Sequence, residues 1–152
     1  VMTIILMLIG GAPGSTAGGM KITTVAVLFV SMISVFRHEK SPAIFKRTIP
    51  NDVVSNAVSV FLLYLILPTT GAMLISRIED IPFLSTMFES ASAVATVGLT
   101  MGITSTLTTV SKAILIILMY TGRVGGLTLV FAAISRKSFG NREYPKDNVA
   151  VG

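Results

Sequence analysis

The sequence predicts an all-α integral membrane protein in which spanning helices alternate with one helix that only enters the bilayer. Three observations predict this fold class. The 152 residues have a mean hydropathy of +0.82 and are 52% hydrophobic but only 12% charged, about half the usual ~25% charged share. Two apolar runs are long enough to cross a bilayer, which takes about 20 helical residues. A third apolar run reaches only about halfway across.

The first element, residues 1–36, is predicted to be one transmembrane span that is broken at residues 10–21. The apolar runs on either side of the break, "VMTIILMLI" and "ITTVAVLFVSMISVF", are each too short to cross a membrane. The break itself reads "GGAPGSTAGGMK". Backbone that leaves the helix at membrane depth is tolerated only where protein or water surrounds it, so the break indicates a permeation pathway.

Two other interpretations of the break are a surface loop between soluble helices and a phosphate-binding loop. The apolar flanks disfavour the first. For the second, Gly14 and Gly19 have the right spacing, but Met20 stands where the lysine belongs and Ile22 follows Lys21 in place of Ser or Thr. A nucleotide-binding enzyme is therefore the rival from a different functional class.

Enzymatic chemistry has little support elsewhere in the sequence. The chain contains no cysteine, and its one histidine, His38, lies among charged residues, where a solvated surface side chain is the better interpretation. We therefore expect no catalytic residue, and no metal site beyond binding of K⁺ or Na⁺.

The distribution of basic residues predicts the topology. Lysines and arginines gather in residues 37–54 and 136–152, namely Arg37, Lys40, Lys46, Arg47, Arg136, Lys137, Arg142 and Lys146. The positive-inside rule makes both segments, a linker and a tail, cytoplasmic. The net charge of +5 is therefore an orientation signal, and we expect no nucleic-acid partner.

The remaining elements are a span at 55–76, a re-entrant helix at 83–94, and a span at 110–135 that is also broken. Residues 95–100, "ATVGLT", follow the re-entrant helix and are expected to be extended. Carbonyls along such a run can replace the hydration shell of a monovalent cation, with Gly98 supplying backbone freedom. The alternative is an amphipathic interfacial helix from Ser85 to Thr100.

Internal repetition supports this organisation. "IILMLIGG" at Ile4–Gly11 and "IILMYTGR" at Ile116–Arg123 share five of eight residues, and both apolar runs stop at a glycine. The chain also begins at Val1 inside an apolar run. We therefore expect a fragment that holds the second half of one span, re-entrant loop, span unit and all of the next.

Three motifs, "GGAPGSTAGGMK", "FESASAVATVGLT" and "YTGRVGGLTL", resemble the carboxy-terminal part of the Ktr/Trk/HKT superfamily of potassium transporters, and most closely the Ktr membrane subunit. The resemblance implies four span, pore-loop, span repeats around one pore in the cytoplasmic membrane. This chain would supply one and a half repeats, with residues 1–36 as the second span of repeat three and residues 55–135 as repeat four.

The resemblance also implies roles for particular residues. The ion-binding selectivity filter would be Ala95, Thr96, Val97, Gly98 and Leu99. The break would be an intramembrane gating loop, whose glycines keep it mobile, with site residues Gly10, Gly11, Gly14, Ser15, Thr16, Gly18, Gly19 and Lys21. Arg123 would anchor this gate, since an arginine near the bilayer centre must be paired.

Two of these roles stay open between alternatives. Lys21 either helps Arg123 or marks the inner end of the loop. Glu89 either adds negative potential behind the filter or accepts hydrogen bonds from nearby backbone.

By the same resemblance, the substrate would be K⁺, with Na⁺ as a candidate coupling ion and no bound cofactor. The partners would be the remaining repeats of the chain, a second copy in a homodimer, and a cytoplasmic nucleotide-binding regulatory subunit. A subunit of a tetrameric potassium channel is the alternative within the same class, and the two non-identical repeats disfavour it.

Overall fold

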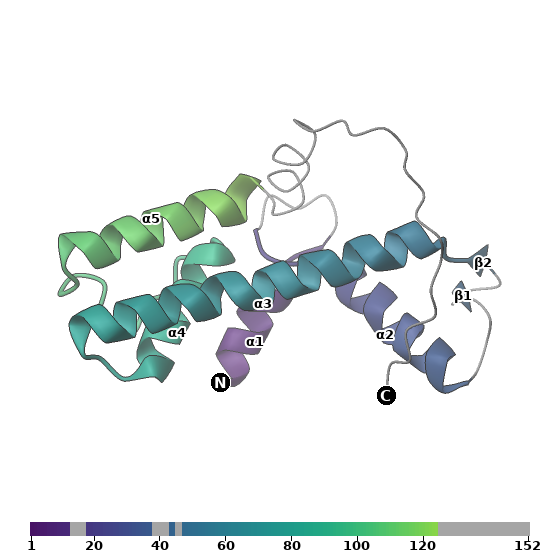
Figure 1. Cartoon of the computed structure of the whole chain (residues 1–152), viewed down its shortest axis with the longest axis horizontal. Helices are drawn as coiled ribbons and strands as arrows, with labels where there is room; N and C mark the ends of the chain where they lie inside the picture. The colour runs from purple at the N-terminus through teal and green to yellow at the C-terminus, as the bar shows by residue number, and fades with distance from the viewer. Residues whose placement is uncertain (13–17, 38–42, 45–46, 125–152) are drawn as a thin grey trace, which may run out of the picture.

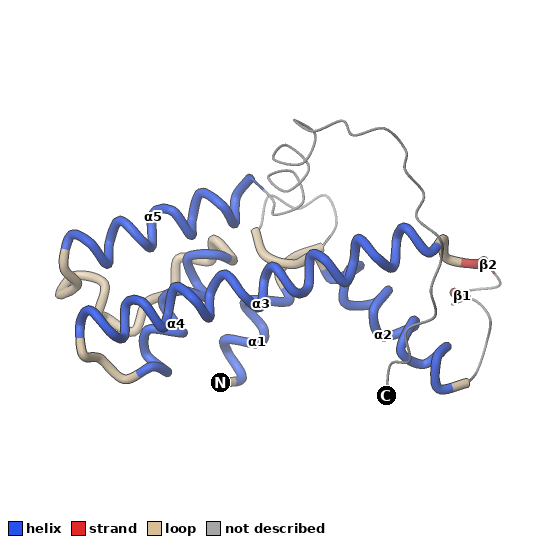
Figure 2. The backbone as a smooth tube through the Cα atoms, viewed as in Figure 1, coloured by secondary structure: helices blue, strands red, loops and turns tan. Residues whose placement is uncertain are grey.

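The computed structural model describes residues 1–12, 18–37, 43–44 and 47–124. Five helices and two short strands make up this part of the chain (Figure 1, Figure 2): α1 Met2–Ile9, α2 Ile22–Phe36, β1 Ala43–Ile44, β2 Arg47–Thr48, α3 Asn51–Glu79, α4 Phe83–Val94 and α5 Thr109–Val124. The helical fold class is therefore confirmed for these residues. The middle of the predicted break, the second half of the last predicted span, and the predicted tail lie outside them.

The linker contains the one departure from the predicted all-α structure in the described residues. Strands β1 and β2 pair antiparallel, with Ala43 opposite Thr48 and Ile44 opposite Arg47. Strands of two residues carry no readable hydrophobic alternation, so this pair leaves no signal in the sequence.

Helix α3 is the long element on which the others are arranged. Its 29 residues extend about 44 Å at 1.5 Å per residue. It is the one helix within the described ranges that is long and apolar enough to cross a membrane, and only 28% of its most apolar window is buried. In Figure 1, α5 and α4 lie along one half of α3, and α2 leaves from the other half towards the linker.

Charged and polar side chains fit the two ends and the middle of α3. Asp52 lies in its first turn and Arg77 in its last, which complements the helix dipole. Pro68 lies inside the helix and is buried. The hydroxyls of Thr69 and Thr70 donate to the carbonyls of Leu65 and Ile66, one turn back, so these polar groups are satisfied within the helix.

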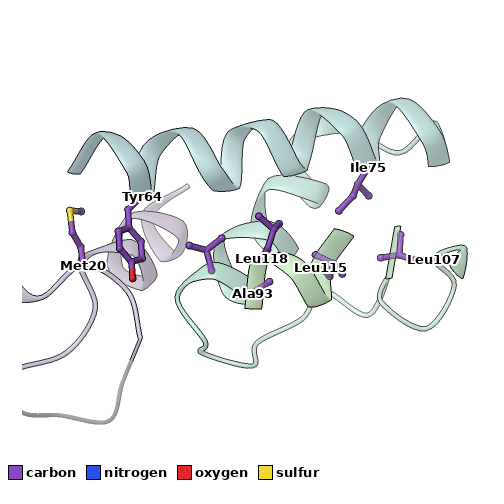
Figure 3. Close-up of a cluster of buried hydrophobic side chains, with 8 residues drawn as sticks. Met20, Tyr64, Ile75, Ala93, Leu107, Leu115 and Leu118 are labelled. Atoms are coloured by element: carbon purple, nitrogen blue, oxygen red, sulfur yellow. The ribbon is translucent and has the colours of Figure 1, made fainter. Parts of the chain in front are cut away.

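The core forms where α4 and α5 pack against α3. Its buried side chains come from all three helices, the end of the break and the α4–α5 connection (Figure 3): Met20, Tyr64, Ile75, Ala93, Val94, Leu107, Leu115 and Leu118. Small side chains on α4, among them Ala91 and Ala93, are almost completely buried. They allow α4 to lie close to both neighbouring helices.

Two glycines set the closest approaches between these helices. A Cβ atom on Gly122 of α5 would overlap the carbonyl of Val94, the last residue of α4. The nearest atoms to a Cβ on Gly71 of α3 all belong to the side chain of Leu118, the closest being Cδ1 at 2.6 Å. The Tyr64 hydroxyl donates to the Gly122 carbonyl at 3.2 Å in a buried contact. The end of α4 is therefore held directly against the backbone of α5.

These contacts predict opposite tolerance at the two glycines. Gly122→Ala places a methyl group into main-chain atoms and should cost about 1–3 kcal/mol. Gly71→Ala meets the tip of a flexible leucine and gains up to about 1 kcal/mol of helix propensity. In the intact purified protein, we expect the midpoint of thermal unfolding to fall by several degrees for Gly122→Ala only. Equal midpoints for the two variants would contradict the contact.

Candidate functional site

Helix α4 ends in a Schellman motif that lies between the other elements. Ala95 is its C-cap residue, and Thr96 has a left-handed φ of 52°. The Thr96 amide donates to the Ala93 carbonyl at 3.1 Å, and the Val97 amide donates to the Ser92 carbonyl at 3.0 Å. These two hydrogen bonds provide donors for two carbonyl groups of the last turn.

The expectation of an extended run from Ala95 is therefore wrong at Ala95, which has helical backbone angles (φ −78°, ψ −4°), and at Thr96. The left-handed conformation is what terminates the helix and returns the two amides to its last turn. Glycine is the usual residue at this position, and a side chain there costs about 1–2 kcal/mol. A β-branched residue in this conformation is a feature that calls for an explanation from its contacts.

The side chain of Thr96 has a partner in the chain break, 78 residues away. The Gly18 amide donates to Thr96 Oγ1 at 3.0 Å. A Cβ atom on Gly18 would overlap Thr96 Oγ1 and would lie 2.9 Å from the Ala95 carbonyl oxygen. The structure therefore brings the predicted loop residue Gly18 into contact with the predicted filter residues Ala95 and Thr96.

The described ends of the break are tied to each other. Helix α1 stops at Gly10, whose φ is 70°, and the chain returns so that the Met20 amide donates to the Leu8 carbonyl at 3.1 Å. The Ile22 amide donates to the Gly11 carbonyl at 3.3 Å. Backbone groups that leave the helix here are thus partly satisfied by hydrogen bonds within residues 8–22.

The structure gives the described glycines a reason other than mobility. A Cβ on Gly10 would overlap the Met20 carbonyl oxygen, and a Cβ on Gly19, whose φ is +86°, would lie 3.3 Å from the Met7 carbonyl oxygen. Close main-chain packing requires glycine at these positions. The predicted loop residues Gly14, Ser15 and Thr16 lie outside the described residues. Lys21 is the exposed N-cap residue of α2.

A hollow of about 520 Å³ is lined on one side by α1 and the described part of the break, and on the other by the segment after α4. The two walls carry the residues that the sequence assigned to the loop and the filter, among them Gly10, Gly11, Gly18, Ala95, Thr96, Val97 and Leu99. Val97 and Leu99 are 44% and 49% exposed. Gly98 has a φ of +81°, and no described atom outside its immediate neighbours lies within 4 Å of a Cβ built on it.

Glu89 binds the residues at the end of this segment that lies away from α4. Its side chain is 5% exposed. Oε1 accepts hydrogen bonds from Thr100 Oγ1 at 2.6 Å and from the Met101 amide at 2.9 Å, and Oε2 accepts one from Thr104 Oγ1 at 2.8 Å. Of the two roles left open by the sequence, these contacts support the structural one, in which the carboxylate braces the chain after Leu99.

Arg123 lies in the last described turn of α5. Its side chain is exposed within the described residues. Its neighbour Gly122 packs against the Val94 carbonyl. The arginine is therefore held one residue from the point where α4 meets α5.

Sequence reasoning missed three contributors to this site. Gly122 and Tyr64 fix the end of α4, and Thr104 completes the Glu89 cluster. Only Gly122 carries a signal, since it is the seventh residue of the second copy of the repeated octapeptide, the position that Gly10 has in the first copy. Within the described ranges, no cluster of three or more histidine, cysteine or acidic side chains offers a metal-ion site.

Comparison with known proteins identifies the family. A sequence model of the family described as TrkH, cation transport protein, matches residues 1–141. The chain belongs to this family. It is 40% identical over 152 residues to the Ktr system potassium uptake protein B of Bacillus subtilis, and 40% identical over 158 residues to the potassium/sodium uptake protein NtpJ of Enterococcus hirae.

Both alignments cover all of this chain, but 34% and 35% of the two relatives. The Ktr system potassium uptake protein B of Vibrio alginolyticus is 38% identical, again over the whole chain and 33% of its own length. The chain therefore spans about a third of the relatives that it matches.

The Glu89 cluster yields a prediction for the intact protein. Glu89→Gln replaces one acceptor oxygen by an NH₂ donor and removes the charge, so the three hydrogen bonds to the carboxylate cannot all persist. Hydrogen bonds to charged groups are worth about 1.5–3 kcal/mol. Amide hydrogen exchange in a peptide covering residues 100–104, measured by mass spectrometry, should therefore be at least about tenfold faster.

Glu79→Gln is the matched control. The Glu79 carboxylate likewise accepts from one amide and two hydroxyls, those of Thr108 and Ser111, at the start of α5. We expect its exchange to rise near residue 108 and to stay unchanged at 100–104. Unchanged exchange at 100–104 in Glu89→Gln would contradict the claim that the Glu89 carboxylate holds this segment in place.

Proposed function

We propose that this chain forms part of a pathway for K⁺ uptake across the cytoplasmic membrane, in which main-chain carbonyls of residues 95–99 bind the permeating cation. The observation that carries the proposal is the end of α4. A helix of 12 residues stops, and the segment that follows it lines a hollow opposite a break in another helix. Membership of a cation transport family and relatives named for potassium uptake support the same conclusion.

The proposed architecture is that of span, pore-loop, span repeats. Helix α4 would extend about 18 Å, roughly half of a bilayer. Helices α1 and α2 would be the two halves of one broken span, and α3 and the longer span that begins with α5 would flank the re-entrant α4. Since the relatives are about three times longer, the other repeats would complete the pore.

The proposed filter works by replacing water. Carbonyl oxygens in a preorganised strand exchange for the hydration shell of a cation. The exposed Val97 and Leu99 would face the rest of the pore, Gly98 would provide the backbone turn between them, and Glu89 would hold the strand from behind. No covalent step is needed, so the chain would be a transporter and not an enzyme.

The break at 10–21 would act as the gate of this pathway. Its described residue Gly18 touches the inner end of the strand, which is where a gate would obstruct a cation. Arg123 would add a positive charge beneath the strand and repel cations. Higher cation flux in Arg123→Ala would support this role, and unchanged flux would remove it.

Further parts of the proposal concern ions and partners. K⁺ is the proposed substrate and Na⁺ the candidate coupling ion, without a bound cofactor. Two relatives carry the name of a Ktr system, which supports a multi-subunit assembly. We place a homodimer and a cytoplasmic nucleotide-binding subunit in that assembly, with residues 37–54 and 136–152 facing the cytoplasm.

Gly98→Ser tests the filter. A left-handed φ costs serine about 1–2 kcal/mol more than glycine, so the backbone of residues 95–99 should rearrange. We therefore expect the preference for K⁺ over Na⁺ to fall about tenfold. Competition between Rb⁺ and Na⁺ for uptake into vesicles that contain the intact protein measures this preference.

Gly102→Ser provides a matched control, because Gly102 also has a positive φ of 88° and equally open space around its Cβ, but lies beyond the strand. We expect its ion preference to stay close to that of the unmodified protein. The same preference in the unmodified protein and in Gly98→Ser would rule out residues 95–99 as the filter.

A further inference from the structure

The hydroxyl oxygen of Thr96 has an amide as its observed donor, and it belongs to a residue that lines the proposed pathway. It accepts the Gly18 amide at 3.0 Å, and Thr96 also lines the hollow through which the proposed cation would approach. A hydroxyl oxygen is a good ligand for a hard monovalent cation and equally a good acceptor for an amide.

We propose that the Thr96 hydroxyl is a shared ligand, bound to the Gly18 amide when the inner end of the strand is empty and to the permeating cation when that end is occupied. Cation binding there and the seating of Gly18 would exclude each other. The inference rests on the proposed function, because it assigns a regulation to the same strand.

Electrostatics makes the two states exclusive. The amide directs the positive end of its dipole at Oγ1, so a cation on the same oxygen would lie within a few ångströms of this partial positive charge, and a low local dielectric strengthens the repulsion between them. Gly18 also packs against the Ala95 carbonyl oxygen, which would lie 2.9 Å from a Cβ on Gly18. The glycine therefore covers two oxygens that a cation would use.

The residue types at both positions fit this arrangement. Glycine would suit the left-handed backbone of residue 96 better than threonine does, but glycine has no side-chain oxygen to offer. At residue 18, any side chain would overlap Thr96 Oγ1. Each residue is thus explained by the other, although 78 positions separate them.

Release of Gly18 does not require the broken span to come apart. The Met20 and Ile22 amides are bonded to the carbonyls of Leu8 and Gly11 within the same segment, not to the strand. A cation at Thr96 can therefore displace Gly18 while these ties keep the ends of α1 and α2 together.

Amide hydrogen exchange of Gly18 in the intact protein tests the inference. In the unmodified protein, K⁺ should speed exchange of a peptide that contains Gly18 about fivefold relative to choline, which is the equivalent of about 1 kcal/mol for one net hydrogen bond. Thr96→Val keeps the side-chain shape but removes the oxygen, so exchange should be fast with either cation. Thr96→Ser keeps the oxygen and should keep the response to K⁺.

The outcomes separate this inference from the function on which it rests. Rb⁺ uptake by vesicles made from the same preparation reports the function. If uptake is present but Gly18 exchange ignores K⁺ in the unmodified protein, or responds to K⁺ equally in Thr96→Val, the shared ligand is disproved and the pathway stands. If the folded protein takes up no Rb⁺, the proposed function fails as well.

Discussion

The structure depends on how one helix ends. Helix α4 stops at Val94, whose carbonyl packs against Gly122 of α5, and its last turn is closed by the amides of Thr96 and Val97. A helix end in apolar surroundings leaves carbonyls that must find donors. Here the donors come from the next two residues along the chain, which forces Thr96 into the left-handed region and sets the direction in which residues 97–100 leave.

Two contacts then fix that outgoing segment at its ends. At one end, Thr96 accepts the Gly18 amide from the segment between α1 and α2, and at the other end Glu89 of α4 accepts from Thr100, Met101 and Thr104. Between these points, Val97 and Leu99 are exposed and line a hollow. A segment that is held at both ends but uncovered along its middle is suited to bind a ligand that passes by, which is why we place the permeating cation there.

The sequence predicted the elements better than their contacts. The helix expected at 83–94 has those bounds in the structure, because Pro82 favours a helix start and the residues that follow it are compatible with a helix. The left-handed Thr96 could not be predicted, since the usual signal for such a C-terminus is glycine. The Glu89 cluster and the Gly18 contact join residues 11 to 78 positions apart, and such pairs leave no periodic trace in one sequence.

The most direct test of the account is the position of a heavy potassium analogue, such as Tl⁺ or Rb⁺, located by anomalous scattering in crystals of the intact protein. The account predicts density in contact with main-chain carbonyl oxygens of residues 95–99, on the side of the hollow. Cation density found only elsewhere in a conducting protein, with these carbonyls turned away from it, would contradict the account.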